Sequence, residues 1–262
     1  MAKFCPLFSG SSGNCTYIEN GNEALLVDAG VSFKRIREAL ESREIDIAKI
    51  KAVLITHDHG DHISGLKTLI KKLHIPVIAS RDTVYNLEYH KILTDENERV
   101  YIDEWEEYNI GSFGIKRFAT SHDCVGSSGY RIKLSDELSI GVCTDLGIVT
   151  DCVRNGLLGC NLVMIESNHD PVMLRLGPYP PELKIRVSGE KGHLSNAVSG
   201  ELCGLLYGSG TKRFILAHLS EKNNTPEKAE SAIRTALFSA GARDGDYILY
   251  IAPPGGGRVM SI

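Results

Sequence analysis

The chain has 262 residues and a formal net charge of −4 at pH 7. A chain of this length can bury one large hydrophobic core, so we expect a single domain over residues 1–262. The apolar fraction of 42% and the charged fraction of 24% are ordinary for a globular enzyme. The negative balance argues against a protein that coats nucleic acid through bulk positive charge.

Seven cysteines are scattered along the chain without any Cys-x-x-Cys pair. This odd number and irregular spacing predict buried free thiols in a reducing compartment. The N-terminal segment Met-Ala-Lys-Phe-Cys-Pro lacks the apolar stretch of a signal peptide. No segment approaches the ~20 apolar residues that span a membrane. We therefore expect a cytoplasmic location and no membrane partner.

Short β-type segments and turns alternate in the first half of the chain. Strands are expected at 15–19 and 23–28, on both sides of the hairpin signal Asn20-Gly21-Asn22. A helix is expected at 32–42, where the apolar residues fall on one face. The other expected elements are a strand at 52–56, a helix at 63–73, and strands at 76–79, 99–103, 113–119, 129–133 and 138–144.

The second half repeats this alternation. Buried strands are expected at 162–166 and 213–217, with a helix at 193–207 between them. The cations Lys184, Arg186 and Lys191 precede that helix; a solvated loop is expected there, with a phosphate contact as the alternative. The last helix has Thr225 as its N-cap and ends near residue 240, before a strand at 247–252. This pattern predicts a mixed α/β protein with two sheets face to face and helices outside.

The segment Thr56-His57-Asp58-His59-Gly60-Asp61-His62 concentrates four candidate metal ligands after an expected buried strand. In extended backbone His57 and His59 point to one side, because side chains alternate with period two. Gly60 is expected to begin a helix, from whose first turn Asp61 and His62 project. Imidazole and carboxylate suit zinc, manganese or iron, so the segment predicts sites for two adjacent ions. The alternative, a histidine-rich polar loop, would cluster these groups without a metal at a desolvation cost.

This segment resembles the HxHxDH signature of the metallo-β-lactamase superfamily. The other motifs of that superfamily occur in the expected order between residues 28 and 218. They are an Asp at the end of an early strand (Asp28), a His after a mid-chain strand (His122), an Asp in Cys-Thr-Asp (Asp145) and a His ending a late strand (His218). Taken singly, His122 and His218 are typical of ordinary polar residues at strand ends; their order and context favour metal ligands.

The resemblance implies a metallo-β-lactamase fold, a four-layer αββα sandwich of two mixed β-sheets flanked by helices. It also implies two divalent metal ions, Mn²⁺ or Zn²⁺, with Fe²⁺ as a further candidate. His57, His59, His122 and Asp145 would bind the first ion. The second would be bound by Asp61, His62, His218 and the shared Asp145. Asp28 would orient one of these ligands through a hydrogen bond.

Two later segments resemble the proton relay of ribonuclease Z. Glu166 lies at the end of an expected buried strand, and His193 lies in Gly192-His193-Leu194-Ser195, at the expected start of a helix. In this resemblance Glu166 backs His193, the general acid that protonates the leaving oxygen, while Asp61 orients the attacking nucleophile. A structural ion pair for Glu166 and a helix-capping role for His193 are the alternatives.

The opening Ser9-Gly10-Ser11-Ser12-Gly13-Asn14-Cys15, taken with the segment around His193, resembles the bacterial YycJ (WalJ) subfamily. Proteins of that subfamily are regarded as exonucleases that act 5′ to 3′ on duplex DNA ends, with a suggested role in repair. The resemblance implies a two-metal phosphodiesterase or nuclease whose partner is nucleic acid, in particular duplex DNA ends. The first alternative is a small-molecule thioester or lactone hydrolase, and the second is a metal-bound protein that binds without catalysis. The native metal and the oligomeric state stay open.

Overall fold

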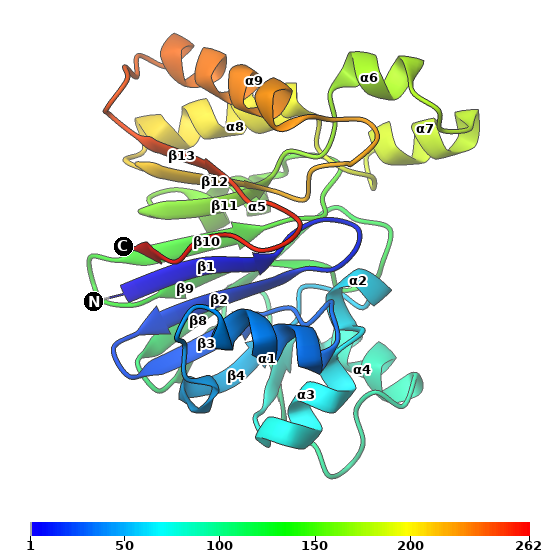
Figure 1. The fold of residues 1–262 in the computed structure, drawn as a ribbon, viewed down its shortest axis with the longest axis vertical. Coiled ribbons are helices and arrows are strands. Elements are labelled where there is room, and N and C mark those ends of the chain that lie inside the picture. The colour runs from blue at the N-terminus through cyan, green and yellow to red at the C-terminus, as the bar shows by residue number, and fades with distance from the viewer. Residues whose placement is uncertain (1) are drawn as a thin grey trace. The chain divides into compact units, whose positions relative to one another are not determined.

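The computed structural model describes residues 2–262. Two compact units make up this part of the chain: residues 2–117, 124–128 and 253–262 form the first, and residues 118–123 and 129–252 form the second. Strands of a mixed β-sheet and several helices build each unit (Figure 1). The expectation of a single domain stays a prediction, because compactness alone does not show whether either unit folds independently.

The sheet of the first unit has the strand order β14-β1-β2-β3-β4-β5-β6. Its antiparallel part contains β14 (Met260–Ser261), β1 (Ala2–Phe8), β2 (Cys15–Asn20) and β3 (Glu23–Val27). Its parallel part continues from β3 to β4 (Ile50–Leu54), β5 (Val77–Ala79) and β6 (Arg99–Tyr101). The expected hairpin is confirmed, because β2 and β3 pair across a turn in which Gly21 has a φ of 62°.

Helices of the first unit pack on its sheet. The helix α1 (Phe33–Glu41) begins where the Ser32 hydroxyl accepts the Arg35 amide, and Ile36 and Leu40 enter the core. The same core contains Leu66 and Leu69 of α3 (Leu66–Leu73). The unit also contains η1 (Ile47–Lys49), α2 (Gly60–Ile63) and α4 (Arg81–Tyr89). The strand β7 (Glu107–Ile110) pairs with β8 (Phe113–Ala119), whose last two residues belong to the second unit.

The second unit has its own run of paired strands. The antiparallel pair β9 (Ser128–Lys133) and β10 (Ser139–Cys143) is followed by the parallel strands β11 (Leu162–Glu166), β12 (Arg213–Ala217) and β13 (Ile248–Ile251). Its helices are α5 (Asp151–Leu157), α6 (Pro171–Leu176), α7 (Pro181–Ser188), α8 (Asn196–Gly208) and α9 (Pro226–Ser239). Leu202 of α8 and Ile233 of α9 share one core with Val163 and Phe214 of the strands.

Three expected elements differ from the structure. The expected helix at 63–73 is two helices, α2 and α3, because the chain breaks at Gly65, whose amide donates to Ala29 O at 2.8 Å. A Cβ at Gly65 would lie 1.9 Å from Val31 O, so only glycine fits this approach. The helix expected from residue 193 begins at Asn196, since Ser195 is its N-cap. Lys184 and Arg186, expected in a loop, lie on α7.

All seven cysteines are free thiols, as their spacing predicts, and five of them are buried. Burial raises the pKa of Cys203 to about 12, so this thiol stays protonated at neutral pH. Within residues 2–262 no helix has both the length and the apolar character that a membrane crossing requires.

Candidate metal centre

Three imidazoles of the first unit pack closely beyond the end of β4. The ring centroid of His57 lies 4.0 Å from that of His62 and 4.6 Å from that of His59. His57 and His62 are fully buried. Gly60, as expected, begins α2, and Asp61 and His62 extend from this short helix. Imidazole nitrogens gathered this closely are the kind of donor that metal ions accept.

Asp28 holds one of these rings in a defined orientation. Its carboxylate accepts a hydrogen bond from Thr56 N at 2.8 Å and lies 2.8 Å from His62 Nδ1. With its proton on Nδ1, the His62 ring presents the Nε2 lone pair on its other side, where Asp61 Oδ2 lies 3.6 Å away. The orienting role expected for Asp28 therefore has a geometric basis in its contact with His62.

Asn14 belongs to this cluster, although the sequence reasoning gave it no individual role. Its side-chain amide nitrogen lies 3.0 Å from His62 Nε2 and donates to Asp61 Oδ2 at 3.3 Å. The backbone of Asn14 accepts from Gly30 N and donates to Asp61 O, both at 2.8 Å. A Cβ at Gly30 would lie 1.7 Å from Asp61 O, which explains the glycine in Asp28-Ala29-Gly30. The small residues before Asn14 were the only sequence signal for this contact.

Carboxylates and imidazoles of the second unit converge where its parallel strands end. Asp145 follows β10, Glu166 ends β11 and His218 follows β12. The carboxyl ends of neighbouring parallel strands meet at one edge of a sheet, which is where α/β proteins place their sites. His193, from the segment before α8, joins them, and the four side chains offer ligand atoms that all lie within 4.8 Å of one another.

Glu166 is the centre of this second cluster. Its Oε1 lies 2.8 Å from His193 Nδ1 and 2.7 Å from His218 Nδ1, and its Oε2 accepts the amides of Leu146 and Leu194. Burial acts to raise the pKa of Glu166, but His193 and His218 outweigh it and lower that pKa to about 2. Although burial opposes the charged form of His193, the carboxylate of Glu166 raises its pKa. The expected pairing of Glu166 with His193 is present, and Glu166 also contacts His218, which was not expected.

His122 lies beside His193 in the second unit. The two ring centroids are 5.2 Å apart, and His122 Nδ1 lies 3.2 Å from Gly192 O. Burial lowers the pKa of His122, which favours the neutral ring. A neutral ring that donates from Nδ1 to a carbonyl has its Nε2 lone pair available for a ligand bond.

Both clusters suit divalent metal ions on the chemistry of their donors. Each combines buried imidazole nitrogen with carboxylate oxygen, the donors that zinc, manganese and iron accept. In the second unit Asp145 Oδ1 also lies 3.3 Å from His218 Nδ1. Buried groups of this kind are costly without a compensating partner, and a divalent cation would supply one.

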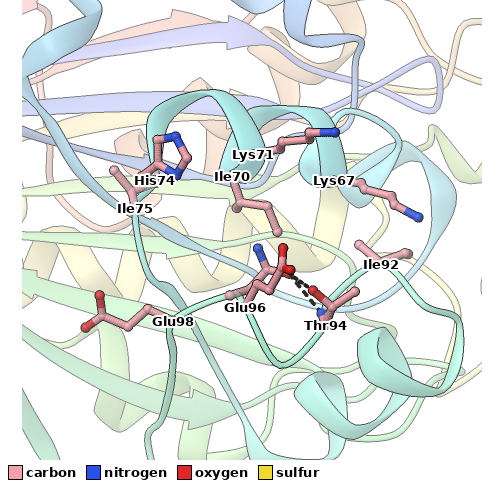
Figure 2. A pocket seen from close by; sticks show the side chains of 10 residues that line it. Lys67, Ile70, Lys71, His74, Ile75, Ile92, Thr94, Glu96 and Glu98 are labelled. Carbon is pink, nitrogen blue, oxygen red and sulfur yellow. Dashed lines mark hydrogen bonds between the residues drawn. The ribbon is translucent and has the colours of Figure 1, made fainter.

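A pocket near the amino ends of β5 and β6 lacks the side chains of a metal site. Its volume is about 420 Å³, and Figure 2 shows its lining side chains, among them Lys67, Lys71 and Glu96. His74 and Glu98 precede β5 and β6, whereas His57 follows the carboxyl end of β4. The lining contains one histidine and no cluster of ligands, so size alone does not mark the reactive site.

Comparisons with known proteins agree with these features. The model of the β-lactamase superfamily domain matches residues 23–219, so the chain belongs to this superfamily. It is 35% identical over 255 residues to exodeoxyribonuclease WalJ of Streptococcus pneumoniae, covering 96% of this chain and 94% of that protein. It is 33% identical over 244 residues to exodeoxyribonuclease YycJ of Bacillus anthracis, covering 93% of this chain and 92% of that protein.

A solved structure supports the fold. Zn²⁺-bound PqqB from Methylobacterium extorquens matches with a TM-score of 0.73 at 15% identity, and the match covers 100% of both chains. The expected metallo-β-lactamase fold with two mixed sheets and flanking helices is confirmed. The chain is a hydrolase of this superfamily and a nuclease by its relatives, with His and Asp clusters suited to metal ions. The residue roles stay predictions.

Proposed function

We propose that the chain is a two-metal exonuclease that degrades DNA 5′ to 3′ from duplex ends and contributes to DNA repair. The observation that carries the proposal is the cluster of Asp145, Glu166, His193 and His218. Each offers a ligand atom, and these atoms all lie within 4.8 Å of one another. It occurs in a chain that is 35% identical over almost its whole length to an exodeoxyribonuclease. Substrate, direction and the role in repair are inferred from the resemblance to that subfamily.

The proposed ligands are those that the superfamily resemblance implies. His57, His59, His122 and Asp145 bind one ion, and Asp61, His62, His218 and the shared Asp145 bind the other, with Asp28 orienting His62. Manganese and zinc are the proposed metals, with iron as a further candidate. When bound, two such ions activate water and neutralise charge on a phosphoryl group.

Side chains of the protein orient the attacking water and protonate the leaving oxygen. Asp61 accepts a hydrogen bond from the attacking water and so orients it toward phosphorus. His193 donates a proton to the leaving oxygen, because Glu166, 2.8 Å away, fixes its Nδ1–H and leaves Nε2 to face the substrate. His193 is less deeply buried than Glu166, which suits a group that meets a substrate.

The test compares two aspartates of one motif. Asp61→Asn should abolish cleavage of a duplex with a 5′-phosphate. The matched variant Asp58→Asn should keep it, because Asp58 accepts a hydrogen bond from the Asn86 side chain, and an amide oxygen can still do so. Duplexes labelled at the 5′ or the 3′ end, assayed with Mn²⁺, Zn²⁺ and Fe²⁺, report direction and metal. Unchanged thermal unfolding of both variants, measured without added metal, would show that the fold is intact.

The proton donor has its own prediction. His193→Ala should slow the chemical step by about 10²- to 10⁴-fold, the usual contribution of a general acid, while substrate affinity changes little. Single-turnover rates and dissociation constants separate the two effects. Full activity in Asp61→Asn would contradict the scheme, and an unchanged rate in His193→Ala would remove the role of His193. Turnover of a glutathione thioester without nuclease activity would favour the small-molecule hydrolase instead.

A further inference from the structure

The helix α4 of the first unit presents two tyrosines to solvent. Tyr85 is 65% exposed and Tyr89 is 73% exposed, although large aromatic side chains usually bury most of their surface. Arg81, Tyr85 and Tyr89 follow one another at intervals of four residues, so they form one stripe along the helix. Val84 and Leu87 on the other side of α4 are buried, so the helix does not need the tyrosines for its own packing.

The helix that bears this stripe contacts the segment from Thr56 to His62, which contains the clustered histidines. Asn86, next to Tyr85 in the chain, donates a hydrogen bond at 3.0 Å to Asp58, which lies between His57 and His59. The start of α4 is also fixed, because the Ser80 hydroxyl accepts the Thr83 amide. The exposed tyrosines are therefore carried by a helix held against the segment that supplies proposed metal ligands.

The charges around the stripe favour an anionic partner. The guanidinium of Arg81 lies over the ring of Tyr101 at 5.1 Å, and Lys91 follows the other end of the helix, with Lys67 Nζ donating to its carbonyl at 3.0 Å. The acids of α4 are Asp82 and Glu88, and Glu88 is paired with Arg99 at 2.7 Å. Arg81 and Lys91 therefore place positive charge at the two ends of the helix, and the pair with Arg99 offsets the charge of Glu88.

We infer that the stripe of Arg81, Tyr85 and Tyr89 binds single-stranded nucleic acid, with bases stacked on the two tyrosines. Exposed aromatic rings beside cations are the combination with which proteins hold single strands, because every base has a face that can stack. Paired bases inside a duplex already stack on one another, so the occupant must be an unpaired stretch, such as an overhang. The inference rests on the proposed function, since the bound strand is part of the nuclease substrate.

The test separates stacking from catalysis. Tyr85→Ala and Tyr89→Ala should each weaken binding of a single strand or an overhang by roughly 5- to 150-fold, the effect of losing one base–aromatic stack. Tyr85→Phe is the matched control and should bind like the native protein, because it keeps the ring. Binding is followed by the fluorescence of 2-aminopurine in the strand, which stacking quenches, and a blunt duplex should show no difference between variants.

A second readout distinguishes failure of the inference from failure of the proposed function. Hydrolysis of bis(p-nitrophenyl) phosphate needs no strand contact and should be equal in the native protein and all three variants. If the native protein cleaves neither this diester nor a duplex with a 5′-phosphate with any metal, the proposed function fails, while the binding test still stands. Native-like strand binding by both alanine variants, or equal losses in Tyr85→Phe and Tyr85→Ala, would overturn the inference. So would a dimer in sedimentation that dissociates on Tyr85→Ala while strand binding is unchanged.

Discussion

Asp28, Asp145 and His218 share an unusual backbone conformation. Each follows a strand and has a left-handed φ, 62°, 58° and 55° respectively. For residues other than glycine this conformation costs on the order of 1–3 kcal/mol and tends to occur at functional sites. Hydrogen bonds hold it at Asp28, whose carboxylate accepts from both the amide and the hydroxyl of Thr56. Each of these turns lies where the side chain joins its cluster.

A substitution of Asp28 tests its role as the hydrogen-bond partner of His62. Asp28→Asn keeps the shape and tolerates the left-handed backbone, but it weakens the acceptor for His62 Nδ1–H. Metal affinity should fall by about 10- to 100-fold, as is usual when the partner of a metal-ligating histidine is lost. Competition with a chelator of known affinity measures this. Asp46→Asn, an exposed cap of η1, is the control and should bind metal like the native protein. Native-like affinity in Asp28→Asn would contradict the orienting role.

Single residues differ in how far the sequence predicts them. His57, His59, Asp61 and His62 were identifiable, because their spacing is local and unusual. Their counterparts in the second unit needed the order of motifs, since each is one polar residue at the end of a strand. The contact of Asn14 with His62 Nε2 and the second hydrogen bond of Glu166, to His218, were not predictable. They depend on segments that are far apart in the chain, and no local pattern specifies such contacts.

Among the elements, buried strands were the most predictable and short helices the least. The strands Leu162–Glu166 and Arg213–Ala217 match their expected bounds, because apolar runs in a parallel sheet have sharp ends. The helices α6 and α7 were missed, as they contain only six and eight residues. A proline opens both of them, at Pro171 and Pro181, and Asp170 caps the first. Those prolines were the sequence feature that could have indicated where the two helices begin.

The contact between β1, β2 and η1 gives a prediction about pH. Glu19 on β2 is buried and lies 2.9 Å from Lys3 Nζ and 3.4 Å from Lys49 Nζ, and it accepts from the Tyr17 hydroxyl at 2.6 Å. Burial acts to raise the pKa of Glu19, but hydrogen bonds from Tyr17 and Lys3 outweigh it and lower that pKa. The carboxylate therefore stabilises the fold above its unfolded pKa, and this contribution is lost as the pH falls through the folded pKa.

Glu19→Gln should consequently lower the free energy of unfolding at pH 7 by about 1–2 kcal/mol, a range reduced because both lysines are partly exposed. The difference from the native protein should shrink when the pH falls below about 4.3, the ordinary pKa of glutamate. Urea unfolding at pH 7 and near pH 3 measures both values. A difference that does not change with pH would show that the charge of Glu19 is not its cause.

For the whole molecule, the net charge of −4 and the proposed anionic substrate are compatible only through local positive charge. Two divalent ions would supply it at the proposed site, and the cations near α4 would add to it for an overhang. Composition alone therefore could not predict the partner. The order of motifs from Asp28 to His218 indicated the superfamily and the metal ligands, because a long ordered series of ligands is rarely accidental. The nucleic-acid partner was inferred from the resemblance of residues 9–15 and of the segment around His193 to one subfamily.

Metal removal tests the molecule as a whole. A ligand at 100 times its dissociation constant stabilises the native state by about 2.7 kcal/mol, which for a chain of this size raises the Tm by roughly 5–11 °C. Protein stripped with a chelator should show this gain when Mn²⁺ or Zn²⁺ is added. His57→Ala in the first unit and His218→Ala in the second should each lose most of it. His90→Gln, at an exposed position after α4, should keep it. Equal gains in all four proteins would place the stabilising ion elsewhere, and the ligand set would be wrong.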